Sequence, residues 1–159
     1  MTESNPSISE RKKGLRQKML AMRRALSANE TESRSSSLKE NILSLLEYKN
    51  AKKIMAFLAM KGESNLDGFI RQALLDGKEV YIPVCLPERQ MEAGRLIDME
   101  HFEKGPLGLR NLPAGYEVTS PESLDLVLIP GLAVSQEGIR LGMGAGYYDR
   151  YLARVPFEK

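Results

Sequence analysis

The sequence predicts an α/β fold, a three-layer sandwich with a mostly parallel central sheet flanked by helices and preceded by an N-terminal helical hairpin. Two observations indicate this class. Two helical segments with apolar stripes precede any strand, and short apolar runs then alternate with helical periodicity, as parallel sheets require. At 159 residues the chain suits one domain, so we expect residues 1–159 to form a single unit after a disordered tail at residues 1–6.

Both N-terminal helices show amphipathic spacing. The first runs from about Ser7 to Leu26, and one apolar stripe for docking is formed by Leu15, Met19, Met22 and Leu26. Ser27 to Glu30 has the S-x-x-E form of a capping box and begins a second helix that reaches about Tyr48. The expected buried side of this second helix consists of Leu38, Ile42, Leu45 and Leu46.

The rest of the chain reads as strands separated by turns and helices. The strand-like runs cover residues 53–60, 79–85, 91–99 and 125–129. A helix over residues 66–75 separates the first two, and a Gly/Pro-rich loop over residues 105–119 precedes the last. A glycine loop and a final helix close the chain. Because ligands collect beyond the carboxyl ends of parallel strands, a loop placed after the last strand is a candidate site.

Composition excludes several classes of protein. The chain is 42% hydrophobic and 28% charged, and it has neither an 18-residue apolar run nor an apolar signal sequence. We therefore expect a cytoplasmic protein, a monomer without a membrane partner. One cysteine, Cys85, excludes an internal disulfide and is expected to be buried, and one histidine, His101, leaves little for a multi-histidine metal site. A net charge of +2 does not predict a nucleic-acid partner.

Residues 140–152, RLGMGAGYYDRYL, form the most informative stretch. Alternating glycines expose backbone N–H groups to an anion, the helix that follows adds a partial positive charge, and Arg140 adds a forked cation. The Walker and dinucleotide-binding glycine patterns are absent, and a purely structural turn remains open. Asp149 either favours the helix dipole or binds Mg²⁺ beside a phosphate. Tyr147 and Tyr148 are either core residues or the wall of a site.

Two further segments carry candidate residues. Seven Lys or Arg residues and no acidic residue lie between positions 11 and 24. Lys12, Arg16 and Arg23 fall in one narrow arc beside the apolar stripe, where they form either a solvated face or a rim of cations facing phosphates. Nucleic-acid binding by this helix is a rival without aromatic support. Glu63 follows the first strand in a turn, as a ligand contact or a helix-start carboxylate.

Taken together, these segments resemble the 5-formyltetrahydrofolate cyclo-ligase (5,10-methenyltetrahydrofolate synthetase) family. Residues 128–133, LIPGLA, followed by Gly138 and the stretch from Arg140, are similar to its strand, Pro-Gly and glycine-loop signature. Lys12 and Arg16 match its N-terminal Lys-x-x-Leu-Arg, and Gly62-Glu63 match its folate-binding turn. The resemblance covers about residues 12–154.

The resemblance implies an enzyme that uses ATP and Mg²⁺ to convert 5-formyltetrahydrofolate into 5,10-methenyltetrahydrofolate, ADP and phosphate. Arg140 and Tyr147 would act in catalysis, and Asp149 would bind Mg²⁺. The implied ATP-binding residues are Lys12, Arg16, Arg140, Leu141, Gly142, Met143, Gly144, Ala145, Gly146, Tyr147 and Tyr148. The implied folate-binding residues are Met60, Glu63, Tyr147 and Tyr148.

The family also implies a longer chain. Its members continue some tens of residues past the glycine loop, through another strand and an Asp that serves the metal, so the C-terminal part of the domain is expected to be missing here. The alternative function is therefore a shortened relative that binds ATP or folate without turnover.

Overall fold

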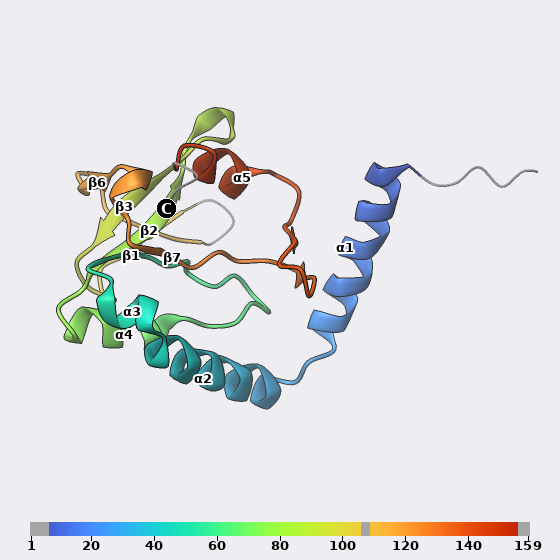
Figure 1. Ribbon diagram of the computed structural model, residues 1–159, viewed down its shortest axis with the longest axis horizontal. Helices are drawn as coiled ribbons and strands as arrows, with labels where there is room; N and C mark the ends of the chain where they lie inside the picture. The colour runs from blue at the N-terminus through green and yellow to red at the C-terminus, as the bar shows by residue number, and fades with distance from the viewer. Residues whose placement is uncertain (1–6, 106–108, 156–159) are drawn as a thin grey trace, which may run out of the picture.

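The computed structural model describes residues 7–105 and 109–155. Helices and a central sheet alternate along this part of the chain, which confirms the α/β class (Figure 1). The tail predicted at residues 1–6 lies outside the described residues. Within them, no helix is long and apolar enough to cross a bilayer.

A five-stranded sheet of order β6-β3-β2-β1-β7 forms the middle of the fold. β1 (Lys53–Met55) lies parallel to both β2 (Glu79–Cys85) and β7 (Leu126–Val127). β3 (Met91–Leu96) returns antiparallel to β2, and β6 (Val118–Thr119) pairs antiparallel with β3. The sheet is therefore parallel around β1 and antiparallel toward the β6 edge.

Helices cover both faces of this sheet, as the three-layer prediction requires. α2 (Ala28–Ser44), α3 (Leu46–Asn50) and α4 (Asp67–Leu75) lie on one face. α5 (Tyr147–Leu152) lies on the other face, where it packs against β3 (Figure 1). The helices thus leave the carboxyl ends of β1 and β7 beside the segment that leads to α5.

Two apolar cores follow from the alternation of side chains along the strands. Ile54, Val80 and Ile82 point to the core under α2–α4, where Phe69 and Ile70 of α4 are fully buried. The opposite core is built on Met55, Tyr81, Met91, Ala93 and Tyr151. Adjacent residues such as Ile54 and Met55 therefore stabilise different layers.

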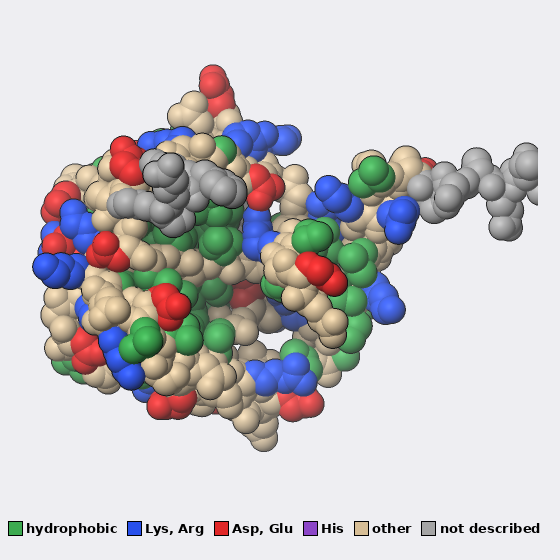
Figure 2. Space-filling view, in the orientation of Figure 1, with side chains coloured by type: hydrophobic (Ala, Val, Ile, Leu, Met, Phe, Trp, Pro, Cys, Tyr) green, Lys and Arg blue, Asp and Glu red, His purple; other side chains and the backbone are tan. Residues whose placement is uncertain are grey.

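α1 (Ile8–Arg24) begins at a capping box between Ser7 and Glu10, but no residue of the helix is buried. Leu15 is 44% and Met22 58% exposed, whereas Met19 and Leu26 are half-buried, so the described residues cover the predicted stripe only in part. The two N-terminal helices are present and joined by a short turn, yet α1 stands apart from the sheet (Figure 1). Blue Lys and Arg side chains and green apolar ones share its surface (Figure 2).

Several boundaries differ from the sequence prediction. The second helix breaks at Leu45, whose extended backbone (ψ 142°) turns Tyr48 of α3 into the core and leaves Leu45 and Leu46 exposed. The first strand ends at Met55, because beyond Ala56 the chain leaves the sheet. Cys85 is exposed, contrary to the expected buried thiol, although desolvation raises its pKa and disfavours a reactive thiolate.

Candidate functional site

The glycine loop follows a short β-hairpin, and Arg140, the first residue of the RLGMGAG stretch, lies in the second strand of that hairpin. β8 (Ala133–Val134) pairs antiparallel with β9 (Arg140–Leu141), which sets Ala133 opposite Leu141. The loop then passes to α5 through Gly144 and Gly146, which have φ of +104° and +74°, a region that favours glycine. Local backbone chemistry thus places the loop between the sheet and α1.

Arg140 is the most connected side chain of this loop. It donates to the carbonyl of Pro130 at 3.0 Å and to a carboxylate oxygen of Asp149 at 2.5 Å. Its guanidinium carbon lies 5.9 Å from the centre of the Tyr148 ring. The structure therefore joins two of the predicted residues, the cation and the carboxylate, as an ion pair.

Arginine side chains cover the three alternating glycines. A Cβ at Gly142 would lie 2.8 Å from Nη1 of Arg140, and a Cβ at Gly144 would lie 3.3 Å from Cζ of Arg16. A Cβ at Gly146 would lie 3.0 Å from Nη1 of Arg150. The missing side chains thus make room for guanidinium groups as well as for an anion.

The main chain of this loop keeps its anion-binding capacity. No hydrogen bond between described residues uses the N–H groups of residues 143–146. Three guanidinium groups lie beside them. Free N–H groups and cations at one place are the groups that an anion site requires.

Of the predicted N-terminal cations, Arg16 reaches the site and Lys12 does not touch it. Nε of Arg16 donates to the carbonyl of Gly142 at 3.0 Å. Lys12 is exposed one turn earlier on α1 and makes no hydrogen bond or ion pair with another described residue.

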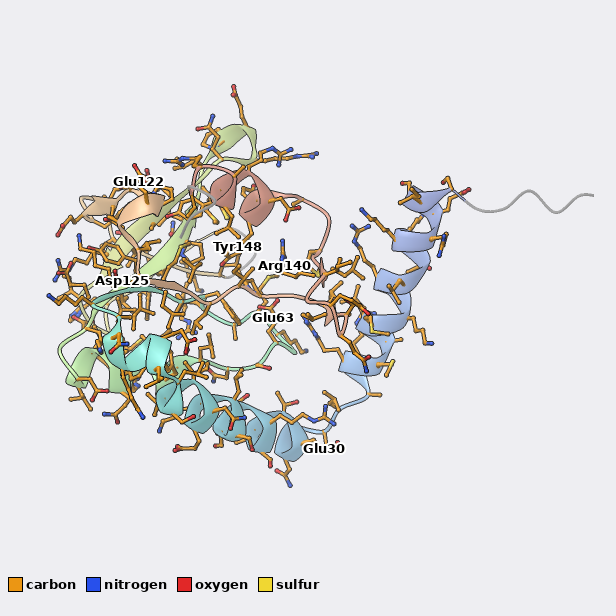
Figure 3. The ribbon with its side chains drawn as sticks, viewed as in Figure 1. Glu30, Glu63, Glu122, Asp125, Arg140 and Tyr148 are labelled. Atoms are coloured by element: carbon orange, nitrogen blue, oxygen red, sulfur yellow. The ribbon has the colours of Figure 1, made fainter. Side chains whose placement is uncertain are left out.

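Glu63 lies in a tight turn after β1. One carboxylate oxygen accepts from the N–H of Met60 at 3.0 Å, and the Glu63 N–H donates to the Met60 carbonyl at 2.9 Å. The other oxygen lies 3.6 Å from Nη1 of Arg23. Met60 itself is 42% exposed, and it does not line the cleft beside this turn. Figure 3 shows Glu63, Arg140 and Tyr148 converging from three separate segments.

A cleft of about 360 Å³ opens beside Glu63. Its polar side is formed by Arg23, Glu63 and Ser64. Its apolar side is formed by Leu38, Ile42, Phe57, Leu66 and the segment 127–129. An apolar cleft with a few polar groups is the usual form of a site for a small organic ligand.

Tyr147 and Tyr148, the first residues of α5, both pack against the second core. Burial raises the pKa of Tyr148, and the nearby Cys85 and Glu63 raise it further, while Arg140 opposes this. The hydroxyl is buried and has no partner among the described residues. The Tyr148 hydroxyl therefore stays protonated and can donate a hydrogen bond to a ligand.

The remaining predicted loop residues differ in exposure. Leu141 is half-buried in β9, and Met143 is 55% exposed. The carbonyl of Ala145 accepts from Arg150 at 2.9 Å. Asp149 exposes 74% of its side chain. Among the described residues, no group of three His, Cys, Asp or Glu gathers to hold a metal, so Asp149 offers a single carboxylate.

Sequence reasoning assigned no role in the site to Arg150, and it grouped Arg23 with the cations that face phosphates rather than with Glu63. Arg150 follows Gly146 by four residues, the spacing that brings a side chain back over the previous helical turn. Arg23 lies in the arc that also contains Lys12 and Arg16, but no motif distinguishes it from the other cations of α1. The only signal in the sequence that could have pointed to Arg23 was its position in this arc.

Comparison with known proteins gives the same assignment as the motifs. The model of the 5-formyltetrahydrofolate cyclo-ligase family matches residues 8–159. The chain belongs to this family. It is 33% identical over 155 residues to the 5-formyltetrahydrofolate cyclo-ligase of Mus musculus, covering 93% of this chain and 76% of that protein. A probable cyclo-ligase of Caenorhabditis elegans is 33% identical over 156 residues, covering 92% and 75%. The predicted family and its ligase class are confirmed.

Solved structures of the family have the same fold. The 5,10-methenyltetrahydrofolate synthetase of Aquifex aeolicus has a TM-score of 0.79 at 35% identity, covering 91% of this chain and 73% of that one. The synthetase of Mycoplasma pneumoniae has a TM-score of 0.74 at 22% identity, covering 93% and 80%. The second likeness supports the fold alone.

Proposed function

We propose that this chain of the cyclo-ligase family converts 5-formyltetrahydrofolate and ATP into 5,10-methenyltetrahydrofolate, ADP and phosphate. One observation carries the proposal: the arginine-covered glycine loop adjoins the cleft that holds Glu63. An anion site beside an apolar cleft suits a phosphate donor that must meet a flat heterocycle. The relatives are named for the same folate substrate and the same methenyl product.

ATP would occupy the loop. The N–H groups of residues 143–146 would receive its phosphates, and Arg16, Arg140 and Lys12 would neutralise them. The loop as a whole, from Leu141 to Tyr148, would provide the backbone and the walls for this ligand. Phosphoryl transfer needs mainly positioning and charge neutralisation, which is what these groups supply.

The folate would occupy the cleft. The carboxylate of Glu63 would accept hydrogen bonds from the N–H groups of the pterin ring, and the exposed side chain of Met60, whose N–H binds Glu63, would contact the ligand. The apolar side would pack against the ring faces. Tyr147 and Tyr148 would close the end toward the loop, where the Tyr148 hydroxyl has a hydrogen bond to give.

The reaction then takes two steps. The formyl oxygen on N5 attacks the γ-phosphorus and ADP leaves, so a phosphorylated imidate forms. N10 attacks the formyl carbon, loses its proton, and the C–O bond to phosphate breaks. Arg140 would stabilise the charge that develops on the transferred group, and Tyr147 would orient the reacting atoms from α5.

Mg²⁺ is compatible with Asp149. This ion takes one or two carboxylates together with phosphate oxygens and water, and Asp149 is mostly exposed beside the loop. Mg²⁺ would supply charge neutralisation between the phosphates. In this state Asp149 is paired with Arg140, so its carboxylate must exchange that partner.

The test is the absorbance of the methenyl product in a mixture of the chain, ATP, Mg²⁺ and 5-formyltetrahydrofolate. We expect product and ADP in equal amounts. Arg140→Ala should lower kcat about 10²-fold, because one preorganised donor to a developing charge contributes about that factor. Arg71→Ala is the matched control, since Arg71 pairs with Glu100 on the surface of α4.

Two results would contradict the proposal. ADP formation at an equal rate without folate would make the chain an ATPase of another kind. Binding of ATP or folate without product would support the alternative of a relative that binds and does not turn over.

A further inference from the structure

We infer that Arg23 is a positioning residue for folate, which fixes the carboxylate of Glu63 in the cleft. The inference rests on the proposed function. Arg23 lies near the C-terminal end of α1, while Glu63 lies forty residues later in the turn after β1. Arg23 is not part of the glycine-loop signature.

The guanidinium group of Arg23 bridges two segments at once. Nη2 donates to the carbonyl of Gly131 at 2.8 Å. Nη1 lies 3.6 Å from an oxygen of Glu63. Because a guanidinium is a rigid fork, the hydrogen bond to Gly131 fixes the orientation of Nη1 toward Glu63.

Burial makes this ion pair more consequential than a surface pair. The side chains of Arg23 and Glu63 are only 18% and 11% exposed, and both line the cleft. A carboxylate beside Phe57 and Leu66 is costly unless a cation stays next to it. Without Arg23, the lowest-energy response of Glu63 is to turn toward water, away from the ligand.

The turn is shaped to accept the stem of Arg23. A Cβ at Gly62 would lie 3.4 Å from Cδ and 3.5 Å from Cγ of Arg23, and Gly62 has φ of +82°. The second oxygen of Glu63 is already held by the N–H of Met60. One oxygen is thus fixed by the turn and the other by α1.

A simpler role for Arg23 would be to attach α1 to the rest of the protein. The two roles differ in which substrate they affect. Lys12 and Arg16 of the same helix serve the ATP side, so a residue that only attaches α1 would change KM for ATP. A residue that orients Glu63 changes KM for folate.

The experiment measures kcat and both KM values for Arg23→Ala, Arg23→Lys, Glu63→Gln and the double variant Arg23→Ala/Glu63→Gln. We expect Arg23→Ala to raise KM for 5-formyltetrahydrofolate about tenfold, with kcat and KM for ATP within about threefold of the unmodified chain. The double variant should equal Glu63→Gln, because Arg23 acts through Glu63. Arg23→Lys should be intermediate, since it keeps the charge and loses the fork.

Arg24→Ala is the matched control. Arg24 is the next residue of α1, is exposed, and makes no hydrogen bond or ion pair with another described residue. It should behave as the unmodified chain. Folding is checked by the melting temperature of each variant, and Arg23→Lys carries the test if Arg23→Ala does not fold.

Failure of the inference is distinguishable from failure of the function. If the unmodified chain cyclises folate but Arg23→Ala matches Arg24→Ala, or if its defect is in KM for ATP, only the role of Arg23 is overturned. Additive effects of Arg23→Ala and Glu63→Gln would overturn it too. If the unmodified chain neither cyclises nor binds 5-formyltetrahydrofolate in a calorimeter, both proposals are overturned.

Discussion

Gly142, Gly144 and Gly146 each leave room for one guanidinium group, and this decides what can replace them. At Gly142 the obstacle is Nη1 of Arg140, the end of a flexible side chain. At Gly144 and Gly146 the positive φ adds backbone strain to any substitution. A substitution at Gly142 therefore tests the effect of filling the space beside Arg140 without adding backbone strain.

We expect Gly142→Ala to displace Arg140 while leaving the fold intact. The new Cβ would lie 2.8 Å from Nη1, so the contacts of Arg140 with Pro130 and Asp149 would be lost. Turnover should fall about tenfold, which corresponds to about 1.4 kcal/mol. The measurement is kcat with the melting temperature recorded beside it.

Gly68→Ala is the comparison variant for that test. Its Cβ would lie 3.6 Å from Cδ of Lys39, an ordinary contact, inside α4. It should keep full turnover. An unchanged kcat in Gly142→Ala would show that the position of Arg140 does not matter for the reaction.

Among single residues, sequence reasoning found those that a motif marks. It indicated Arg140, Asp149, Glu63 and Arg16, and the structure places them around one region. The pairing of Arg140 with Asp149 was not predicted. A motif gives residue types at fixed spacing, whereas the choice of partner depends on the path of the loop in space.

At the level of elements, α1 and α2 form a natural comparison. Both begin at a capping box, Ser7 with Glu10 and Ser27 with Glu30. α2 buries Ser35 and Ile42, whereas α1 buries nothing. The same local signal therefore stabilises one helix that belongs to the core and one that does not.

We expect Ser27→Ala to lower the free energy of unfolding by about 1 kcal/mol, the usual contribution of an N-cap. For a chain of this size the melting temperature should fall by about 2–4 °C. Ser7→Ala should leave the global melting temperature unchanged, because opening of α1 exposes no core.

Hydrogen exchange checks this difference directly. In Ser7→Ala the amides of α1 should exchange faster while those of β2 do not change. Equal losses of melting temperature in the two variants would mean that α1 unfolds together with the core.

Elements were predictable where local chemistry decides them. β2 has the bounds that its apolar run indicates, and the predicted capping box of Ser27 and Glu30 marks the start of α2. The apolar stripe of α1 was misleading in part, because periodicity reveals a face and not what covers it. The break at Leu45 was not predicted, because it is stabilised by the packing of Tyr48 in the core and not by a local sequence signal.

For the whole molecule, tyrosine burial in both cores predicts how stability depends on alkaline pH. A hydrogen bond to Glu92, with burial, raises the pKa of Tyr116 to about 12, and burial raises the pKa of Tyr151 to about 12. Burial also raises the pKa of Tyr48 and Tyr148. In the unfolded chain these groups titrate near a pKa of about 10.

The sign follows from linkage. A raised pKa means that the native state holds the proton more tightly, so this stabilisation is complete below about pH 10 and is lost as pH rises toward 12. We expect the melting temperature to fall steeply between pH 10 and 11.5. Tyr116→Phe removes one of these protons and should make the decline shallower, and a constant melting temperature over that range would contradict the assignment.

The arrangement of the whole sheet is what joins the two halves of the site. Parallel pairing of β7 with β1 brings residues 128–131 beside the turn that contains Glu63. Sequence reasoning predicted both strands but not that they are neighbours. Strand order is a long-range property, so the contact of Arg23 with Gly131 and Glu63 could not be foreseen.

Both arginines that attach α1 bind main-chain carbonyls, those of Gly142 and Gly131. Every amino acid has that carbonyl, so the acceptor survives any substitution that keeps the path of the backbone. Relatives can therefore change the residues around the acceptors without compensating changes at Arg16 and Arg23. Such a contact leaves no trace of paired substitutions between the arginine and its acceptor, so methods that infer contacts from covariation would miss these two attachments and could detect only the pairing of Arg23 with the Glu63 side chain.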